Sequence, residues 1–243
     1  MAKKTFGILE NNPDVMNPLA ARLGLSPALA FHDVYSLTEP DLLALAPRPA
    51  HALLVTIPMT PAWKRAREEE DAGKGDYEDV GDDPVLWFKQ TIGNACGSIG
   101  LLHCVLNGAP VEHILPASEL ARIRAEAQPK TMLPRARVLE ESEFYEAAHR
   151  DAAQQGQSEV PPVDHDRGNH FVAFVKGTDG HLWELEGSRK GPLDRGVLAE
   201  NEDMLSEKAL DAGLRRVMEI EKNDEGGDLL FSCIVLAPAL RNP

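Results

Sequence analysis

Residues 170–186 contain two short apolar runs joined by a tight turn, which is the pattern of a β-hairpin. The run HFVAFVK is followed by GTDG and then by HLWELE. A three-residue loop whose last residue, Gly180, takes the left-handed conformation is a favoured connection. It places Gly177 opposite His181, so the numbers of facing residues add up to 358. This register constrains the fold, because it commits part of the chain to an antiparallel sheet.

The same register brings two titratable residues onto one face of the hairpin. Glu186 faces Val172 and lies diagonally across from His170. Diagonal neighbours sit about 7–8 Å apart at Cα, a gap that long side chains can bridge. A loop of two or four residues would instead put the two side chains on opposite faces. An ordinary exposed strand pair is the plainer interpretation, and the spacing alone leaves both open.

The rest of the chain mixes helical and strand patterns without a regular β-α-β order. Pro13 follows two asparagines and starts an amphipathic run that Gly24 can end. The acidic, glycine-rich stretch 72–84 indicates a surface linker, and 150–169 lacks periodicity, as functional or mobile loops do. We expect one domain over 1–243, with an α/β (α+β) fold in which helices flank a mainly antiparallel sheet. The expected helices cover 13–24, 41–46, 63–71, 114–129, 138–149 and 202–221, and the further strands cover 31–37, 50–59 and 229–236.

Composition narrows the possible functions. The net charge of -14 argues against a nucleic-acid partner, which requires a basic surface, and it suits a basic partner or simply solubility. The three cysteines follow no zinc-binding spacing, which indicates free thiols in a reducing compartment. Two of them, Cys104 and Cys233, sit in apolar runs and are expected to be buried and unreactive. The sequence has no signal-peptide pattern and no apolar run of about 18 residues, so we expect a cytoplasmic protein, with access to the nucleus allowed and no membrane association.

The segment QTIGNACGSIGLLH carries the strongest chemical signal. Polar, turn-prone residues precede Cys96 and an apolar helical pattern follows it, so we expect Asn94 to cap a helix with Cys96 in its first turn. Unpaired N–H groups and the positive end of the helix dipole favour a thiolate there. Gly93 and Gly97 are expected to leave room for a substrate backbone, and the amide of Gln90 can donate to a developing oxyanion. A small buried thiol is the alternative interpretation.

A nucleophilic cysteine needs a base within hydrogen-bonding distance. His103 lies seven residues after Cys96 on the same expected helix, which separates the two by roughly 10 Å. That is too far for a hydrogen bond of about 3 Å, so His103 is expected to be a packed helix histidine. His170 on the hairpin is the better candidate. Glu186 can accept the proton on its Nδ1 and leave Nε2 for the thiol.

These segments together resemble a known family. QTIGNACGSIGLLH is similar to the active-site signature of the ubiquitin C-terminal hydrolases, peptidase family C12. The likeness to the short, single-domain members continues through LENNPDV, FHDVYSL, PRPAHALLVTIP, GQSEVPP, the hairpin and the closing strand. It covers essentially the whole chain. It implies a papain-like cysteine protease fold with a knotted backbone, an exception to the rule against knots, and it implies no metal or cofactor.

The resemblance also implies a role for each site residue. Cys96 becomes the nucleophile, His170 the general base and acid, and Gln90 the oxyanion donor. Glu186 stands where the family usually has aspartate, which is one methylene shorter. Asn169 replaces a bulky apolar residue. These two departures leave open how well His170 is oriented.

The implied activity is removal of small adducts or short peptides from the C-terminus of ubiquitin by a monomeric enzyme. The segment of about 147–168 resembles the family's crossover loop, which arches over the catalytic centre and hinders folded polyubiquitin. Carboxylates can bind the arginine-bearing ubiquitin tail through charge-assisted hydrogen bonds, although solvated surface charge is their plainer interpretation. Two alternatives stay open: a ubiquitin-binding protein of low turnover that stabilises free ubiquitin, and a hydrolase that prefers a ubiquitin-like modifier. The acidic residues offered for the tail are Glu10, Asp14, Asp33 and Asp228.

Overall fold

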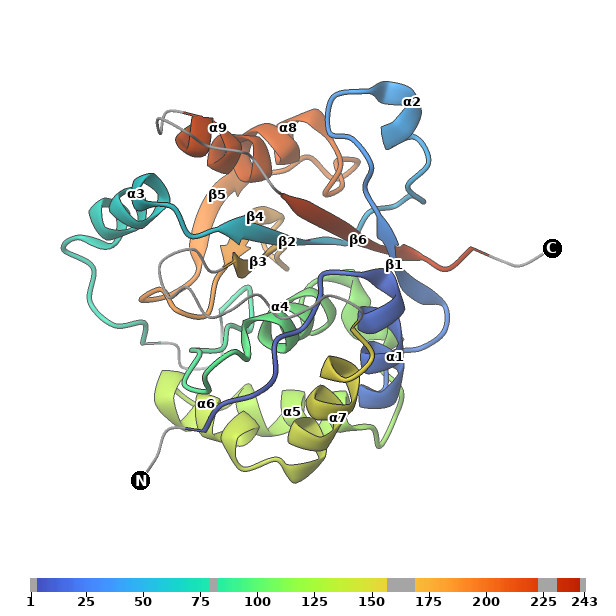
Figure 1. The fold of residues 1–243 in the computed structure, drawn as a ribbon, viewed down its shortest axis with the longest axis vertical. Coiled ribbons are helices and arrows are strands. Elements are labelled where there is room, and N and C mark those ends of the chain that lie inside the picture. Colours follow the sequence, from blue (N-terminus) through green and yellow to red (C-terminus); the bar gives the residue numbers. More distant parts are fainter. Residues whose placement is uncertain (1–3, 79–82, 157–168, 223–230, 241–243) are drawn as a thin grey trace.

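A central antiparallel sheet organises the molecule (Figure 1). The computed structural model describes residues 4–78, 83–156, 169–222 and 231–240, and within them the sheet has six strands. Their spatial order is β1-β6-β2-β3-β4-β5, so β6 lies between β1 and β2. The expected mixed architecture with a mainly antiparallel sheet is confirmed. The strands are β1 (Leu29–Asp33), β2 (Ala52–Pro58), β3 (Asn169–Lys176), β4 (His181–Leu185), β5 (Leu193–Val197) and β6 (Ser232–Pro238).

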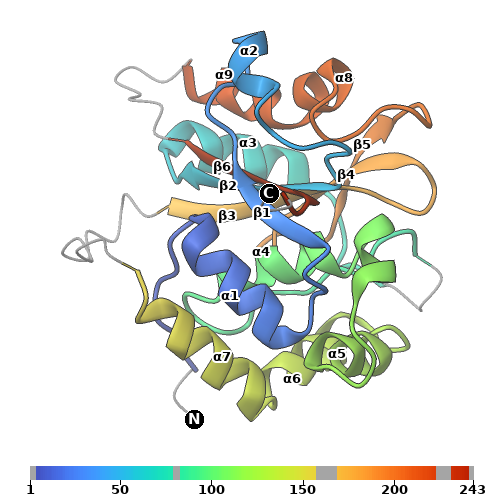
Figure 2. The same ribbon diagram turned by 90° about the vertical axis from the view of Figure 1, so that its right-hand side faces the viewer.

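Helices cover both faces of the sheet, and Figure 2 shows them as layers above and below it. One face carries α1 (Pro13–Leu23), α4 (Cys96–Val105), α5 (Glu119–Ala127), α6 (Met132–Glu140) and α7 (Glu143–Ala153), with a short 3₁₀ helix (Ala109–His113) after α4. The other carries α2 (Pro40–Leu43), α3 (Pro61–Asp71), α8 (Glu207–Leu210) and α9 (Arg216–Lys222), the last two joined by a π-helical turn (Asp211–Arg215). Along β2, Leu54 packs into the first layer, whereas Leu53 and Val55 pack into the second. Burial on both faces explains why this strand is apolar at every position except Thr56.

The helix α1 begins and ends where its capping residues predict. The side chain of Asn12 accepts a hydrogen bond from the backbone N–H of Asp14 at 2.8 Å, and Pro13 occupies the first turn. Gly24 follows the last residue with a φ of 112°, and its N–H donates to the carbonyl of Ala20 at 3.0 Å. Glycine adopts this left-handed conformation at little cost, so it ends the helix.

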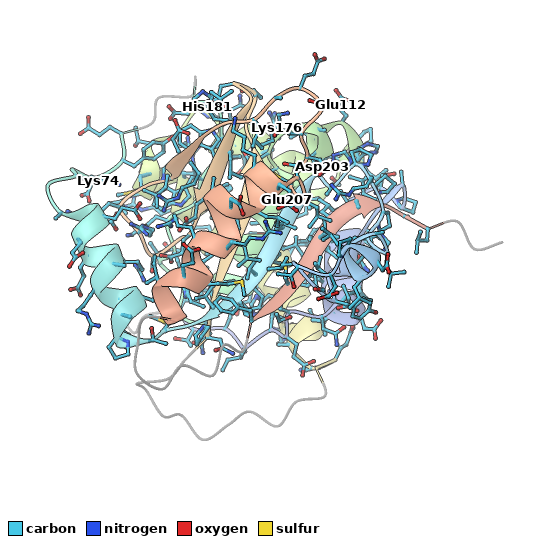
Figure 3. The ribbon with its side chains drawn as sticks, turned by 90° about the horizontal axis from the view of Figure 1, so that it is seen from above. Lys74, Glu112, Lys176, His181, Asp203 and Glu207 are labelled. Carbon is cyan, nitrogen blue, oxygen red and sulfur yellow. The ribbon has the colours of Figure 1, made fainter. Side chains whose placement is uncertain are left out.

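The hairpin has the predicted register. Lys176 faces Leu182 and Ala173 faces Leu185, so both pairs add up to 358. Gly180 has a φ of 80°, and the N–H of Gly177 donates to the carbonyl of His181 at 2.9 Å. Figure 3 labels Lys176 and His181 on the two strands beside this turn. Turn chemistry alone therefore fixed the pairing of β3 with β4.

Several predicted elements have different bounds. The helix expected over 138–149 is divided between α6 and α7, because the side chain of Ser142 caps α7 by accepting from the N–H of Tyr145 at 3.0 Å. The segment of about 147–168 begins inside α7, which extends to Ala153, and 157–168 lies outside the described residues. Other elements differ by a few residues: β1 starts and ends earlier than expected, and the helix expected over 202–221 is interrupted by the π-helical turn. None of the described helices is both long and apolar enough to span a membrane.

Candidate active site

Cys96 is the first residue of α4, which packs against β2 and β3. Its predicted place in the first helical turn is confirmed, and its side chain is half-buried. The predicted cap is wrong: Ala95 takes the capping position and offers no side-chain bond. Asn94 instead has a φ of 58°, and its side-chain amide donates to the carbonyl of Phe6 at 3.2 Å. Asparagine tolerates the left-handed region better than most residues, so Asn94 turns the chain into the helix.

The two glycines beside the cysteine contact the protein itself. A Cβ added to Gly93 would lie 2.8 Å from Oγ1 of Thr5, and one on Gly97 would lie 3.1 Å from Cβ of Leu9. The N-terminal segment also pairs with this loop, because the N–H of Phe6 donates to the carbonyl of Gly93 at 2.8 Å. The expectation that these glycines leave room for a substrate backbone is therefore wrong. They leave room for residues 5–9.

His170 reaches the cysteine from β3. It is the second residue of that strand, pairs with Ile57 of β2 and is 7% exposed. Its ring lies 6.2 Å from the ring of Trp63 on α3, centroid to centroid. A hydrogen bond links its imidazole to the thiol of Cys96. The structure thus brings together the two residues that the sequence placed 74 positions apart.

Glu186 engages the opposite side of the imidazole. Its side chain is completely buried, and its Oε1 lies 2.5 Å from Nε2 of His170. The predicted contact between these side chains is present, but the predicted assignment of ring nitrogens is wrong, since Nε2 faces the carboxylate. Nδ1 is then the nitrogen left for the thiol. Glu186 lies one residue beyond the last pair of the ladder, Ala173 with Leu185, so ideal strand geometry does not describe its approach.

His170 and Glu186 each stabilise the charged form of the other. Burial lowers the pKa of His170, but its hydrogen bonds to Cys96 and Glu186, and the charges of these groups, outweigh burial and raise the pKa to about 10. Burial raises the pKa of Glu186, whereas its hydrogen bond to His170 and the positive charges of His170 and Arg67 lower it to about 2. At neutral pH the imidazole is therefore protonated and the carboxylate is ionised.

Gln90 lies on the segment before α4 and is tied to the turn that carries Glu186. Its backbone N–H donates to the carbonyl of Gly187 at 2.7 Å. Its side-chain amide donates to the carbonyl of Ile92 at 3.2 Å. An amide nitrogen carries two hydrogens, so this bond is compatible with donation to an oxyanion. The role of Gln90 as the oxyanion donor remains a proposal.

His103 and Cys104 are packed as predicted, whereas Cys233, on the other face of the sheet, is half-buried rather than fully buried. His103 is fully buried, and its Nε2 accepts a hydrogen bond from the backbone N–H of Phe88 at 3.0 Å. Burial lowers its pKa to about 3, so the ring is neutral and serves the fold. Cys104 is buried and directs its sulfur to the carbonyl of Leu53 at 3.7 Å. Burial raises the pKa of Cys233 to about 12.

Three of the four acidic residues suggested for substrate binding lie on or next to α1. Glu10 follows Leu9, which packs on Gly97 next to Cys96. Asp14 lies exposed in the first turn of α1, and Asp33 is the exposed last residue of β1. The fourth residue, Asp228, lies outside the described residues.

Residues of α3 belong to the site although the sequence did not indicate them. Nη2 of Arg67 lies 3.2 Å from Oε2 of Glu186 and donates to Oγ of Ser188 at 2.8 Å. The guanidinium also lies 4.6 Å from the ring centroid of Trp63. One signal could have found this pair: tryptophan and arginine four positions apart occupy one face of an otherwise exposed, charged helix.

The fold resembles a solved enzyme structure. The catalytic domain of UCH37 from Trichinella spiralis, crystallised with ubiquitin vinyl methyl ester, superposes with a TM-score of 0.73 at 21% sequence identity. The match covers 98% of this chain and 97% of that domain. At this identity the likeness establishes the fold.

Sequence comparison establishes the family. Ubiquitin carboxyl-terminal hydrolase isozyme L1 of Equus caballus is 36% identical over 234 residues, covering 95% of this chain and 97% of the horse protein. A ubiquitin carboxyl-terminal hydrolase of Aplysia californica is 35% identical over 189 residues, covering 78% and 85% of the two chains. The family model of ubiquitin carboxyl-terminal hydrolases, family 1, matches residues 6–219. The chain therefore belongs to the ubiquitin carboxyl-terminal hydrolases of family 1, the C12 peptidases.

Proposed function

We propose that this chain is a deubiquitinating cysteine hydrolase that releases small adducts and short peptides from the C-terminal glycine of ubiquitin. One observation carries the proposal: the thiol of Cys96 is hydrogen-bonded to His170, whose Nε2 lies 2.5 Å from Oε1 of Glu186. A nucleophile, a base and a group that orients the base form the arrangement that acyl transfer requires.

The geometry supports a two-step reaction. The thiolate of Cys96 attacks the carbonyl carbon of the terminal glycine, and the oxyanion forms near the N-terminus of α4. The backbone N–H of Cys96, which has no acceptor within the helix, and the amide of Gln90 stabilise the negative charge. Protonated His170 gives its proton to the departing amine or thiol, which leaves a thioester. Water, deprotonated by His170, then hydrolyses the thioester and restores the free thiol.

Ubiquitin as partner is supported by the family and by the fold. The similar Trichinella spiralis domain was solved with ubiquitin vinyl methyl ester bound. The chain carries a net charge of -14, which suits a substrate tail rich in arginine. We propose that Glu10, Asp14, Asp33 and Asp228 contribute acidic contacts to this tail. A monomeric, cytoplasmic enzyme is the accompanying expectation.

The test uses ubiquitin with a fluorogenic amide at its C-terminus. The wild-type chain should release the fluorophore, and Cys96→Ala should abolish release while still binding ubiquitin. Cys233→Ala is the matched control, because it removes a thiol from the opposite face of the sheet and should keep activity. Release by Cys96→Ala at the wild-type rate would refute the proposal.

Measurements on the same purified protein test two alternative functions. A ubiquitin-binding protein of low turnover would bind tightly with a kcat several orders of magnitude below ~1 s⁻¹, the low end for ordinary enzymes. The close approach of Glu186 to His170 favours efficient turnover, despite the longer carboxylate. A preference for a ubiquitin-like modifier would appear in parallel labelling with electrophilic probes of each modifier. Faster labelling by such a probe than by the ubiquitin probe would overturn the proposed substrate.

A further inference from the structure

The carboxylate of Glu186 is held from two sides. Oε1 lies 2.5 Å from Nε2 of His170 and accepts from the backbone N–H of Ser188 at 2.8 Å, whereas Oε2 lies 3.2 Å from Nη2 of Arg67. We propose that Arg67, supported by Trp63, is a positioning residue that fixes Glu186 against His170. The inference rests on the proposed hydrolase function and deepens it, because it assigns a role to α3.

The need for such a residue follows from the side chain itself. Glutamate has one more rotatable bond than aspartate, so its carboxylate has more orientations to lose before it can align an imidazole. Glu186 is completely buried, and a buried charge is tolerated only when its oxygens are paired. Arg67 places a positive charge 3.2 Å from Oε2, which accepts no hydrogen bond, while Oε1 is directed at His170. The extra methylene is thereby compensated by a second anchor.

Trp63 holds Arg67 in place. The two residues are one helical turn apart on α3, and the guanidinium lies 4.6 Å from the centroid of the Trp63 ring. That ring is 3% exposed and lies 6.2 Å from the ring of His170. Trp63 therefore lies against both the positioning residue and the imidazole.

The end of α3 is tied to the turn that follows Glu186. Arg189, which is 2% exposed, binds Glu70 at 2.8 Å and Asp71 at 2.9 Å. Figure 3 shows α3 at the side of the sheet, with Lys74 just beyond its last turn. These ion pairs keep the distance between Arg67 and Glu186 short, so α3 acts as a rigid support for the catalytic pair.

Other charged or titratable groups also face Glu186, and they do not replace Arg67. Lys89, on the segment before α4, directs its ammonium to the carbonyls of Ser188 and Arg189 at 3.1 and 2.6 Å. His103 on α4 is neutral because burial lowers its pKa to about 3. The positive charges of His170 and Arg67 are the main ones that lower the pKa of Glu186, and the ammonium of Lys89 also interacts with this carboxylate.

The first experiment compares Arg67→Gln with Arg65→Gln, an exposed arginine on the same helix, in hydrolysis of a fluorogenic ubiquitin amide. We expect Arg67→Gln to reduce kcat roughly 10–100-fold, the range seen when an orienting partner is lost, with KM close to that of the wild type. The acidic limb of its pH profile should move to higher pH, because Glu186 loses a neighbouring positive charge. Arg67→Lys should recover part of the loss, and Arg65→Gln should match the wild type in all respects.

A second variant separates positioning from folding. Arg67 lines a cavity of about 410 Å³ together with Lys64, Asp71 and Ser188, so small cations can reach the space that Arg67→Ala would open. Millimolar guanidinium should restore activity to Arg67→Ala, whereas sodium at the same concentration should not. A wild-type kcat and pH profile in Arg67→Gln would overturn the inference, and so would a loss in Arg67→Ala that guanidinium leaves unchanged. An inactive wild-type enzyme would instead refute the proposed hydrolase function.

Discussion

Ser98 lies on α4, two residues after Cys96, and its hydroxyl is 2.7 Å from Nδ1 of His149 on α7. Nε2 of the same ring lies 2.8 Å from the carbonyl oxygen of Gly7, which can only accept, so Nε2 carries the hydrogen. Nδ1 therefore accepts from Ser98, and Ser98 accepts from the hydroxyl of Tyr145 at 2.6 Å. This buried chain of hydrogen bonds links α4, α7 and the N-terminal segment, and it begins two residues after the candidate nucleophile.

Removal of the central hydroxyl should destabilise the fold. Ser98→Ala leaves Nδ1 of His149 and the hydroxyl of Tyr145 buried without this partner, which should lower the free energy of unfolding by about 1–3 kcal/mol. Urea denaturation followed by circular dichroism measures the change. Thr38→Ala, which removes an exposed hydroxyl, should stay within about 0.5 kcal/mol of the wild type. Equal effects of the two substitutions would mean that the buried chain contributes nothing to stability.

The same histidine should make stability depend on pH. Burial lowers the pKa of His149 below its ordinary value of 6.5, so the unfolded chain binds a proton before the folded chain does. The contribution of His149 is complete above about pH 6.5 and is lost as the pH falls toward the folded-state pKa. The free energy of unfolding should therefore decrease less between about pH 7.5 and pH 5 in His149→Gln than in the wild type.

His181 provides a control of opposite sign for that measurement. The hydrogen bond that His181 donates to the carboxylate of Asp194 raises the pKa of His181, so its contribution to stability is present below about pH 6.5 and is lost as the pH rises. The small effect of His181→Gln on the free energy of unfolding should therefore disappear at alkaline pH. The effect of His149→Gln on the same quantity should become smaller at acidic pH. Identical pH profiles of the wild type and His149→Gln would contradict the assigned state of the buried ring.

The three thiols should differ in reactivity. The thiolate is the form that is alkylated, and burial raises the pKa of Cys233 to about 12 and that of Cys104 well above its ordinary range. Cys96 is half-buried at a helix N-terminus. Iodoacetamide at mildly alkaline pH should therefore modify Cys96 first in the folded protein, as read by fragmentation mass spectrometry. Modification of all three at one rate, as expected after denaturation in urea, would contradict this order.

The sequence predicted those parts of the site that depend on local geometry. The register of β3 with β4 followed from one turn, and that register placed His170 near Glu186 on one face of the sheet. His103 could be excluded as the base of Cys96 because seven residues of helix separate the two side chains by too great a distance. The choice between Nδ1 and Nε2 did not follow, because it depends on side-chain rotation at a point where the ladder has ended.

The sequence could not predict contacts between distant segments. Gly93 is close to Thr5, and Arg67 is close to Glu186, in each case across a large separation in the chain. A glycine next to a cysteine has the same local pattern whether a substrate or the protein's own N-terminal segment occupies the adjacent space. The residue that fills this space is fixed by tertiary packing, to which local propensity does not extend.

Glu184 is the centre of a buried group of ion pairs and provides a final prediction. It is 2% exposed, with its carboxylate 2.8 Å from Arg195 and 2.9 Å from Arg216, and it joins β4 to β5 and α9. Glu184→Gln keeps the size of the side chain and removes its charge, which takes this counter-ion from Arg216 and leaves Arg195 paired with Glu70 alone. Loss of one partner from such a buried group should lower the free energy of unfolding by about 3–5 kcal/mol.

The matched control for Glu184 is Glu207, which also pairs with an arginine. Its partner, Arg215, lies 2.5 Å away, but the Glu207 side chain is 76% exposed and lies on the surface of α8 (Figure 3). Water and salt screen this pair, so Glu207→Gln should leave the urea midpoint almost unchanged. Added salt should reduce any remaining effect of Glu207→Gln and leave that of Glu184→Gln intact, because buried charges are screened much less. A midpoint for Glu184→Gln equal to that of Glu207→Gln would show that burial of the ion-pair group adds nothing to stability.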